Sequence, residues 1–114
     1  ERVPLGMITE AAPAEKSEDV RMRVLSARKI QEQRLTERGI LTNAEMSNKD
    51  LKVFAELDAQ TKDFFQRAAT QLALTARGYN RVLKVARTIA DLAGREHIQQ
   101  QDIAEALQYR FTNE

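Results

Sequence analysis

The chain has 114 residues, a formal net charge of +1 at pH 7, 42% hydrophobic residues and 31% charged residues. This length fits one small domain with a single core, and no apolar run approaches membrane-spanning length. The absence of cysteine excludes disulfides and thiolate metal sites, and a single histidine, His97, argues against a histidine-based metal site or catalytic triad. We therefore expect a cytoplasmic protein without a membrane partner or a metal site of its own.

Residues 1–16 differ in composition from the rest of the chain. They contain both prolines and the small-residue run AAPAEK, and the sequence does not start with methionine. These features predict an extended connector, with a short strand over residues 2–8, that leads from a missing domain. A helical domain is then expected over residues 17–114.

The first helix is expected to run from Ser17 to about Arg38. Ser17 is a hydroxyl cap followed by two acidic residues, and Gly39 supplies the C-terminal stop. The residues predicted to face the core are Val20, Val24, Ala27 and either Ile30 or Gln31. A loop follows to Met46.

Two further helices are predicted from their N-caps. The run Ser47-Asn-Lys-Asp50 resembles a capping box and opens a short helix through Leu51, Val53 and Phe54. Asp58 can cap the next helix. Its expected apolar stripe is Thr61, Phe64, Phe65, Ala68 and Leu72.

The fourth helix is predicted from Ala76 to Ala93, with Thr75 as its N-cap and Gly94 as its stop. At 100° per residue, its broad apolar face consists of Tyr79, Val82, Leu83, Ala86, Ile89, Ala90 and Ala93. The opposite side carries Arg77, Arg81, Lys84 and Thr88. A fifth helix is expected over residues 101–109, with Ile103, Leu107, Ala104 and Ala106 facing inward. The pattern as a whole predicts an all-α bundle of four to five helices.

Arg77 is the candidate functional residue. It lies in the first turn of its helix, where the positive end of the helix dipole favours carboxylates rather than a guanidinium. The position is suitable if an anion binds there, because free N–H groups and the guanidinium would both face it. Arg81 and Arg28 are weaker candidates for an anion contact.

The remaining charged residues have structural interpretations. Arg87 is expected to extend its stem over the core, and Asp91 to form an intrahelical ion pair with it worth a few tenths of a kcal/mol. Arg34 and Arg28 are interpreted mainly as surface charges. His97 follows a helix end in a charged loop and is expected to be solvated.

No catalytic constellation is present. The Walker A pattern GxxxxGK[ST] is absent, so the chain is not expected to bind a nucleotide or to act as an enzyme by itself. Two segments are basic: residues 21–38 carry six basic and two acidic side chains, and residues 74–100 are also basic. These segments are either solvated helix faces or phosphate contacts.

The run LTARGYNRVLKVARTIADLAGREHIQQQDIAEALQYR resembles the C-terminal helical domain of the magnesium-chelatase subunit I family, and is most similar to its bacterial competence branch. RMRVLSARKIQEQR is similar to the first helix of that domain, and GILTNAEMSNKDL to the loop with an asparagine before a methionine. The usual Leu-Ser-Ala-Arg is Leu-Thr-Ala-Arg here, which keeps a hydroxyl cap, and Gly78 replaces a residue that is often alanine.

The resemblance implies the lid of an AAA+ ATPase. In that family a core binds ATP and Mg²⁺, the subunits form a ring, commonly a hexamer, and an arginine matching Arg77 is sensor 2, which reaches the γ-phosphate. The resemblance also implies that the parent protein moves along DNA during recombination. The expected partners are thus the core, neighbouring subunits and, through the parent, DNA. The alternatives are an independent helical DNA-binding module and a protein-interaction bundle.

Overall fold

The computed structural model describes residues 17–40 and 42–113, with the side chains of 17–40 and 42–109. Every regular element in this part of the chain is a helix, which confirms the all-α prediction. The α-helices are α2 (Ser17–Leu35), α3 (Asn48–Phe54), α4 (Ala59–Gln71), α5 (Ala76–Leu92) and α6 (Gln100–Asn113), and the 3-10 helices are η1 (Thr36–Arg38) and η2 (Asn43–Glu45). The connector and strand predicted over residues 1–16 lie outside the described residues.

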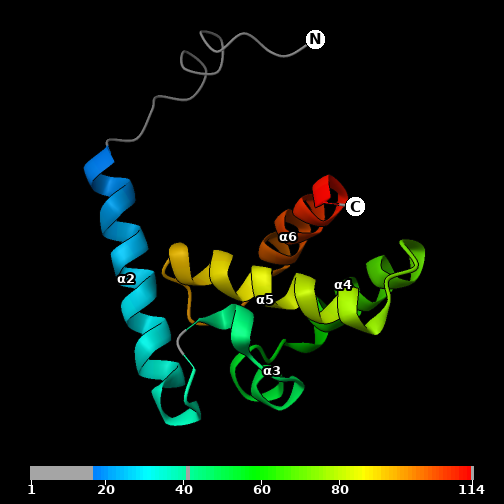
Figure 1. The fold of residues 1–114 in the computed structure, drawn as a ribbon. Coiled ribbons are helices and arrows are strands. Elements are labelled where there is room, and N and C mark those ends of the chain that lie inside the picture. The colour runs from blue at the N-terminus through cyan, green and yellow to red at the C-terminus, as the bar shows by residue number, and fades with distance from the viewer. Residues whose placement is uncertain (1–16, 41, 114) are drawn as a thin grey trace, which may run out of the picture.

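Helix α5 is the centre of the fold. It packs against α6, α2, η2 and α3, while α4 packs against α6. Figure 1 shows α2 crossing the C-terminal end of α5, with α3 below α5 and α6 rising behind it. The buried apolar core consists of Leu35, Met46, Leu51, Ala55, Phe65, Val82, Leu83, Ala86, Ala90, Ile98, Ile103, Ala106 and Leu107.

The three predicted N-caps at the starts of α3, α4 and α5 are confirmed. In each case a side-chain oxygen accepts a hydrogen bond from the backbone N–H three residues later: Ser47 from Asp50 (3.2 Å), Asp58 from Thr61 (2.7 Å) and Thr75 from Gly78 (3.0 Å). The carboxylate of Asp50 in turn accepts a hydrogen bond from the backbone N–H of Ser47 (3.1 Å), which completes the predicted capping box. The backbone N–H of Thr61 is the main cause that holds the pKa of Asp58 below its usual value.

The helix stops are also where the glycines predict them. Gly39 and Gly94 have φ angles of 73° and 75°, in the left-handed region that favours glycine. The first helix is not uniform, because α2 ends at Leu35 and the chain tightens into η1 before Gly39. The predicted loop before Met46 contains η2, a short helix that the sequence pattern does not predict.

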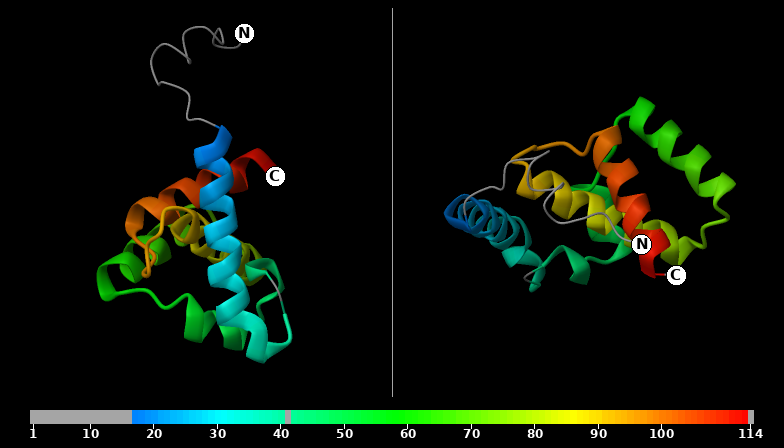
Figure 2. Two further views of the ribbon diagram at one scale, coloured as in Figure 1. Left: turned by 90° about the vertical axis from the view of Figure 1, so that its left-hand side faces the viewer. Right: turned by 90° about the horizontal axis from the view of Figure 1, so that it is seen from above.

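The predicted core face of α2 is wrong in part. Ala27 is buried and so is Gln31, which was predicted as the alternative to Ile30, but Val20 and Val24 are exposed. The reason is the length of α2, whose N-terminal end extends past the edge of α5 (Figures 1 and 2). Arg23 still lies beside residues of α5 and α6.

The apolar faces of the other helices follow the predictions closely. In α4, Thr61 and Phe65 are buried, and the other members of the stripe are half-buried. In α6, Ile103, Ala106 and Leu107 are buried and Ala104 is half-buried. In α5, Ala93 is an exception: it caps the helix C-terminus and is exposed.

Candidate functional site

The first turn of α5 presents Arg77 to solvent. Arg77 is the second residue of the helix and is exposed. Within residues 17–40 and 42–109, its guanidinium has no hydrogen bond or ion pair, and the first turn of α5 carries no acidic residue. The first N–H groups of a helix lack intrahelical acceptors. The positive helix end and an unpaired guanidinium therefore coincide, as the sequence predicts.

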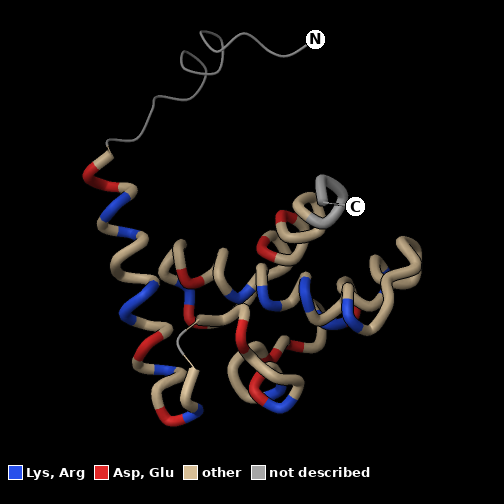
Figure 3. Tube along the Cα trace, in the orientation of Figure 1, with Lys and Arg blue, Asp and Glu red and all other residues tan. Residues whose placement is uncertain are grey.

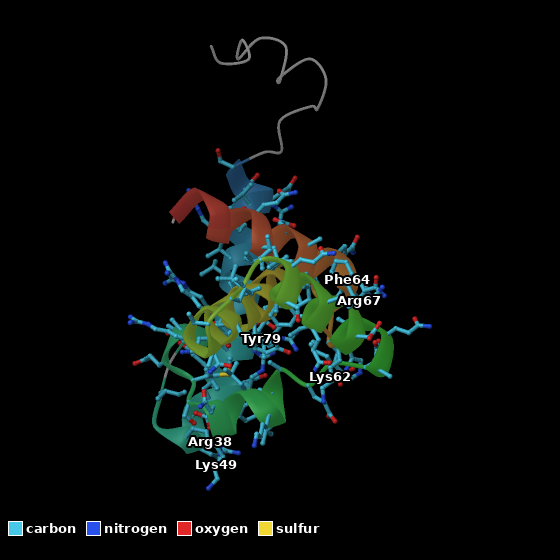
Figure 4. All side chains as sticks on the ribbon, turned by 90° about the vertical axis from the view of Figure 1, so that its right-hand side faces the viewer. Arg38, Lys49, Lys62, Phe64, Arg67 and Tyr79 are labelled. Atoms are coloured by element: carbon cyan, nitrogen blue, oxygen red, sulfur yellow. The ribbon has the colours of Figure 1, made fainter. Side chains whose placement is uncertain are left out.

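This turn is held firmly in place. Thr75 caps the helix, and two residues after Arg77 the ring of Tyr79 stacks on Phe65 of α4 with centroids 4.0 Å apart and an interplanar angle of 13°. Tyr79 is half-buried, and burial raises the pKa of its phenol. In Figure 4, Tyr79 lies at the middle of the view, between the two helices. Arg77 thus projects from a fixed segment of backbone.

The polar side of α5 forms one wall of a shallow groove. Arg77, Arg81 and Lys84 line it along α5, and Ala44 of η2 and Asn48 of α3 line the other wall. Figure 3 shows these basic positions following one another along the helix. The structure thus brings Arg77 and Arg81 to the same groove.

The residues on this polar side of α5 differ in their exposure and in whether they have a polar partner. Arg81 is exposed and, like Arg77, has no polar partner in the described part of the chain. Lys84 is half-buried and donates from Nζ to the carbonyl oxygen of Ala44 (3.1 Å). Thr88 is half-buried and accepts from Nδ2 of Asn43 (3.0 Å). Arg77 and Arg81, near the start of α5, are therefore accessible to a ligand. Lys84 and Thr88, further along the helix, bind η2 to α5.

Arg28 is not part of this groove. It is exposed on α2, which crosses the opposite end of α5 (Figure 1). Asp91, which pairs with α2, is fourteen residues beyond Arg77, or about 21 Å along the helix axis. Arg28 therefore does not converge on an anion bound at Arg77.

A buried ionic cluster at the C-terminal end of α5 was missed by the sequence analysis. Asp91, whose side chain is 1% exposed, accepts two hydrogen bonds from the guanidinium of Arg34 (2.9 and 2.8 Å) and one from Nδ2 of Asn43 (2.9 Å). Arg87 adds an ion pair at 3.1 Å. The predicted pair of Arg87 and Asp91 exists, but it is buried rather than exposed, and Arg34 is a structural residue rather than a surface charge.

Arg87 also differs from its prediction. Its side chain is 3% exposed, so the guanidinium is enclosed rather than extended to water. It donates to the carbonyl oxygens of Arg95 (2.9 Å), Glu96 (2.9 Å) and Phe54 (3.3 Å). Burial is the main cause that lowers the pKa of Arg87, and the neighbouring Asp91 opposes that shift. The cluster therefore joins α2, η2, α3 and the turn before α6 to one end of α5.

The described residues form neither a metal site nor a membrane-spanning helix. His97 is exposed, as predicted. No group of three or more His, Asp or Glu side chains in residues 17–40 and 42–109 is placed to hold a metal ion. Across the same part of the chain, every helix is too short or too polar to traverse a lipid bilayer.

Comparison with known proteins places the chain in a family. The family model described as magnesium chelatase, subunit ChlI C-terminal, matches residues 14–110. Competence protein ComM of Haemophilus influenzae is 42% identical over 96 residues, which are 84% of this chain and 18% of the relative. Uncharacterized protein YifB of Escherichia coli is 32% identical over 108 residues (94% and 21%), and an uncharacterized protein of Mycobacterium tuberculosis is 36% identical over 102 residues (90% and 20%).

The chain spans about a fifth of the length of these relatives. The family match covers the helices that carry both Arg77 and the cluster around Asp91. The chain belongs to the family of the C-terminal domain of the magnesium chelatase subunit ChlI.

Proposed function

We propose that this chain is the nucleotide-sensing lid of an AAA+ ATPase and that Arg77 is its sensor 2 arginine. In this proposal ATP and Mg²⁺ bind to a core elsewhere in the parent protein, and the guanidinium of Arg77 contacts the γ-phosphate. The lid itself carries no catalytic residue. The parent subunits assemble as a ring, commonly of six copies.

One observation carries the proposal: a guanidinium without a polar partner in the described residues lies in the first turn of the central helix. Arg77 is exposed and faces a groove, and no acidic residue of that turn neutralises it. A planar guanidinium is well suited to a terminal phosphate, because its N–H groups match the phosphate oxygens. Membership of the chelatase family supports the same assignment.

The mechanism follows from how α5 is held. Its first turn is fixed by the Thr75 cap and the stacked Tyr79, and its last turn by the cluster around Asp91. A phosphate bound at Arg77 would therefore pull on the whole bundle rather than on one side chain. Release of the phosphate removes that contact, and the lid can rotate against the core and transmit hydrolysis to the ring.

Arg81 is proposed as a second, weaker contact. It lies one turn after Arg77 in the same groove and is free of polar partners in the described residues. It is placed to approach the nucleotide or the surface that surrounds it. The position of Arg28 on α2 argues against such a role for that residue.

The name of one relative, competence protein ComM, suggests the process served by the parent. We propose that the parent is a motor acting on DNA during recombination. The competing function is direct DNA binding by this domain, favoured by the exposed Arg77 and Arg81 in one groove. Salt-dependent DNA affinity of the 114-residue chain separates the two, since the lid proposal predicts negligible binding by the isolated domain.

The decisive experiment is ATP hydrolysis by the parent protein carrying Arg77→Ala, with and without DNA, together with ATP affinity. Loss of one charged contact to the transferred phosphoryl group should cost about 2–4 kcal/mol, or roughly thirty-fold or more in rate. Arg67→Ala is the matched control, because Arg67 is an exposed arginine on α4 (Figure 4) whose ion pair with Asp63 lies on the surface. Unchanged turnover in Arg77→Ala would refute the sensor role.

A further inference from the structure

The N-terminal half of α2 exposes apolar side chains on two sides. Met22 is 62% exposed and Leu25 is 55% exposed, while Val20 and Val24 are 40% and 37% exposed. Scattered apolar residues on a surface are ordinary, but here four lie within six residues of one helix. This part of the molecule is the largest departure from the expected burial.

The two pairs point in different directions. At 100° per residue, Val20 and Val24 share the side of α2 on which Ala27 is buried, and continue that side beyond the edge of α5. Met22 and Leu25, three residues apart, lie on the opposite side, which faces away from the described helices. A helix that is apolar on both sides is typical of a position between two packed layers.

The charges around Met22 and Leu25 indicate the chemistry of the second layer. Arg21, Arg28 and Lys29 flank them, are exposed, and have no polar partner in the described part of the chain. Arginine and lysine can cover apolar surface with their stems while their charged ends pair at the rim. Glu18 and Glu32 are exposed on the same side of α2, so the complementary surface is apolar at its centre and polar, with charges of both signs, at its edge.

The length of the relatives indicates which polypeptide supplies the surface that covers α2. The curated relatives are about five times as long as this chain. The exposed pairs lie in the half of α2 that begins at Ser17, so the preceding polypeptide is covalently attached at that end of the helix. A segment covalently attached at that point has a high effective concentration at α2, so even a modest patch is sufficient for docking.

We infer that the outer side of α2, formed by Met22 and Leu25 with Arg21, Arg28 and Lys29 at its rim, docks on the preceding part of the same polypeptide. This inference rests on the proposed function, because it requires an ATP-binding core that precedes this domain in the parent protein. It assigns Arg28 to the interface between lid and core rather than to the nucleotide. The lid is thus held at α2 and contacts ATP through the far end of α5.

The native methionines provide the test. Met22 is 62% exposed and Met46 is 2% exposed, so peroxide should oxidise Met22 quickly and Met46 slowly in the 114-residue chain. If docking reduces the exposure of Met22 below a tenth, its oxidation rate in the full-length parent should fall about fivefold or more. The rates are read by mass spectrometry of the peptides that contain Met22 and Met46, with Met46 as the internal control.

Two results would overturn the inference. Equal oxidation rates of Met22 in the chain and in the parent would mean that α2 stays uncovered. Protection that appears only at concentrations where the parent assembles would place a neighbouring copy, rather than the same polypeptide, on α2.

A pair of variants of the parent sharpens the test. Leu25→Ser should restore fast oxidation of Met22, whereas Val53→Ser, at an equally exposed position on α3, should leave Met22 protected. Arg77→Ala should also leave Met22 protected, because Arg77 lies at the other end of α5. Loss of the sensor role and loss of the docking surface are therefore distinguished by separate measurements. Continued protection of Met22 in Leu25→Ser would contradict the assignment of this side of α2.

Discussion

Replacing Asp91 by asparagine should destabilise this domain strongly, because it removes the charge at the centre of a buried ionic cluster. The carboxylate of Asp91 is 1% exposed and lies between two guanidinium groups, those of Arg34 and Arg87. Asparagine keeps the shape of the side chain but removes its charge. The two arginines would then remain close together and largely enclosed, without a counter-ion.

The size of the effect follows from the burial of the partners. Arg87 is 3% exposed and cannot reach water, whereas Arg34 is 13% exposed and can be partly hydrated. Removing one member of a buried ion pair typically costs 3–5 kcal/mol. Because Arg34 retains some access to solvent, we expect a loss near the lower limit, about 3 kcal/mol.

Urea denaturation of the 114-residue chain, followed by circular dichroism, measures this loss. The midpoint should fall with little change in the denaturant slope, and the melting temperature should fall by about 12 °C or more. The matched control is Asp63→Asn, because Asp63 also pairs with an arginine four residues away but is 66% exposed. That control should cost less than about 0.5 kcal/mol. Equal effects of the two substitutions would refute the view that Asp91 holds a buried cluster.

Three further predictions concern the helix ends. Thr75→Ala should lower the free energy of unfolding by about 1 kcal/mol in the same denaturation assay, because the N–H of Gly78 loses its acceptor; no loss would contradict the capping role. Gly94→Ala should cost about 1 kcal/mol, because the φ of 75° is unfavourable for alanine, and an unchanged midpoint would count against that reasoning. The carboxyl of Asp58 should titrate below 3.8 in a carbon NMR experiment. Its lowered pKa means that its stabilising contribution is present above pH 3.8 and is lost as pH falls through the folded value; a midpoint at or above 3.8 would exclude this contribution.

The parts of the fold that the sequence predicts depend on neighbours within a few residues. The caps at Ser47, Asp58 and Thr75 and the stop at Gly94 each involve groups no more than about four residues apart, and all are present. Helical periodicity likewise places the buried side of α5. The exposed Arg77 follows from its local position after a cap, which is why this part of the candidate site was predictable.

The predictions that were wrong concern residues whose environment depends on contacts between segments distant in the sequence. The bond from Arg34 to Asp91 joins residues 57 positions apart, so the pattern around either residue gives no indication of the other. Arg87 was expected at the margin of the core because a wheel shows its angle but not the loops that enclose it. Val20 and Val24 lie on the predicted side of α2, yet periodicity does not show where the neighbouring helix ends.

The cluster around Asp91 and the groove at Arg77 have opposite electrostatic roles on one helix. At the C-terminal end, Arg34 and Arg87 share the carboxylate of Asp91. Arg34 also donates to Oδ1 of Asn43, and Arg87 donates to three backbone carbonyl oxygens from α3 and the turn before α6. At the N-terminal end, Arg77 and Arg81 have no carboxylate partner among the described residues, and the helix dipole adds to their positive field. The paired charges around Asp91 hold α5 in the bundle. The unpaired guanidinium groups of Arg77 and Arg81 make the other end of the helix favourable for an anion. A helix that is held at both ends, but whose charges are paired at only one of them among the described residues, is what the proposed contact of Arg77 with a phosphate requires.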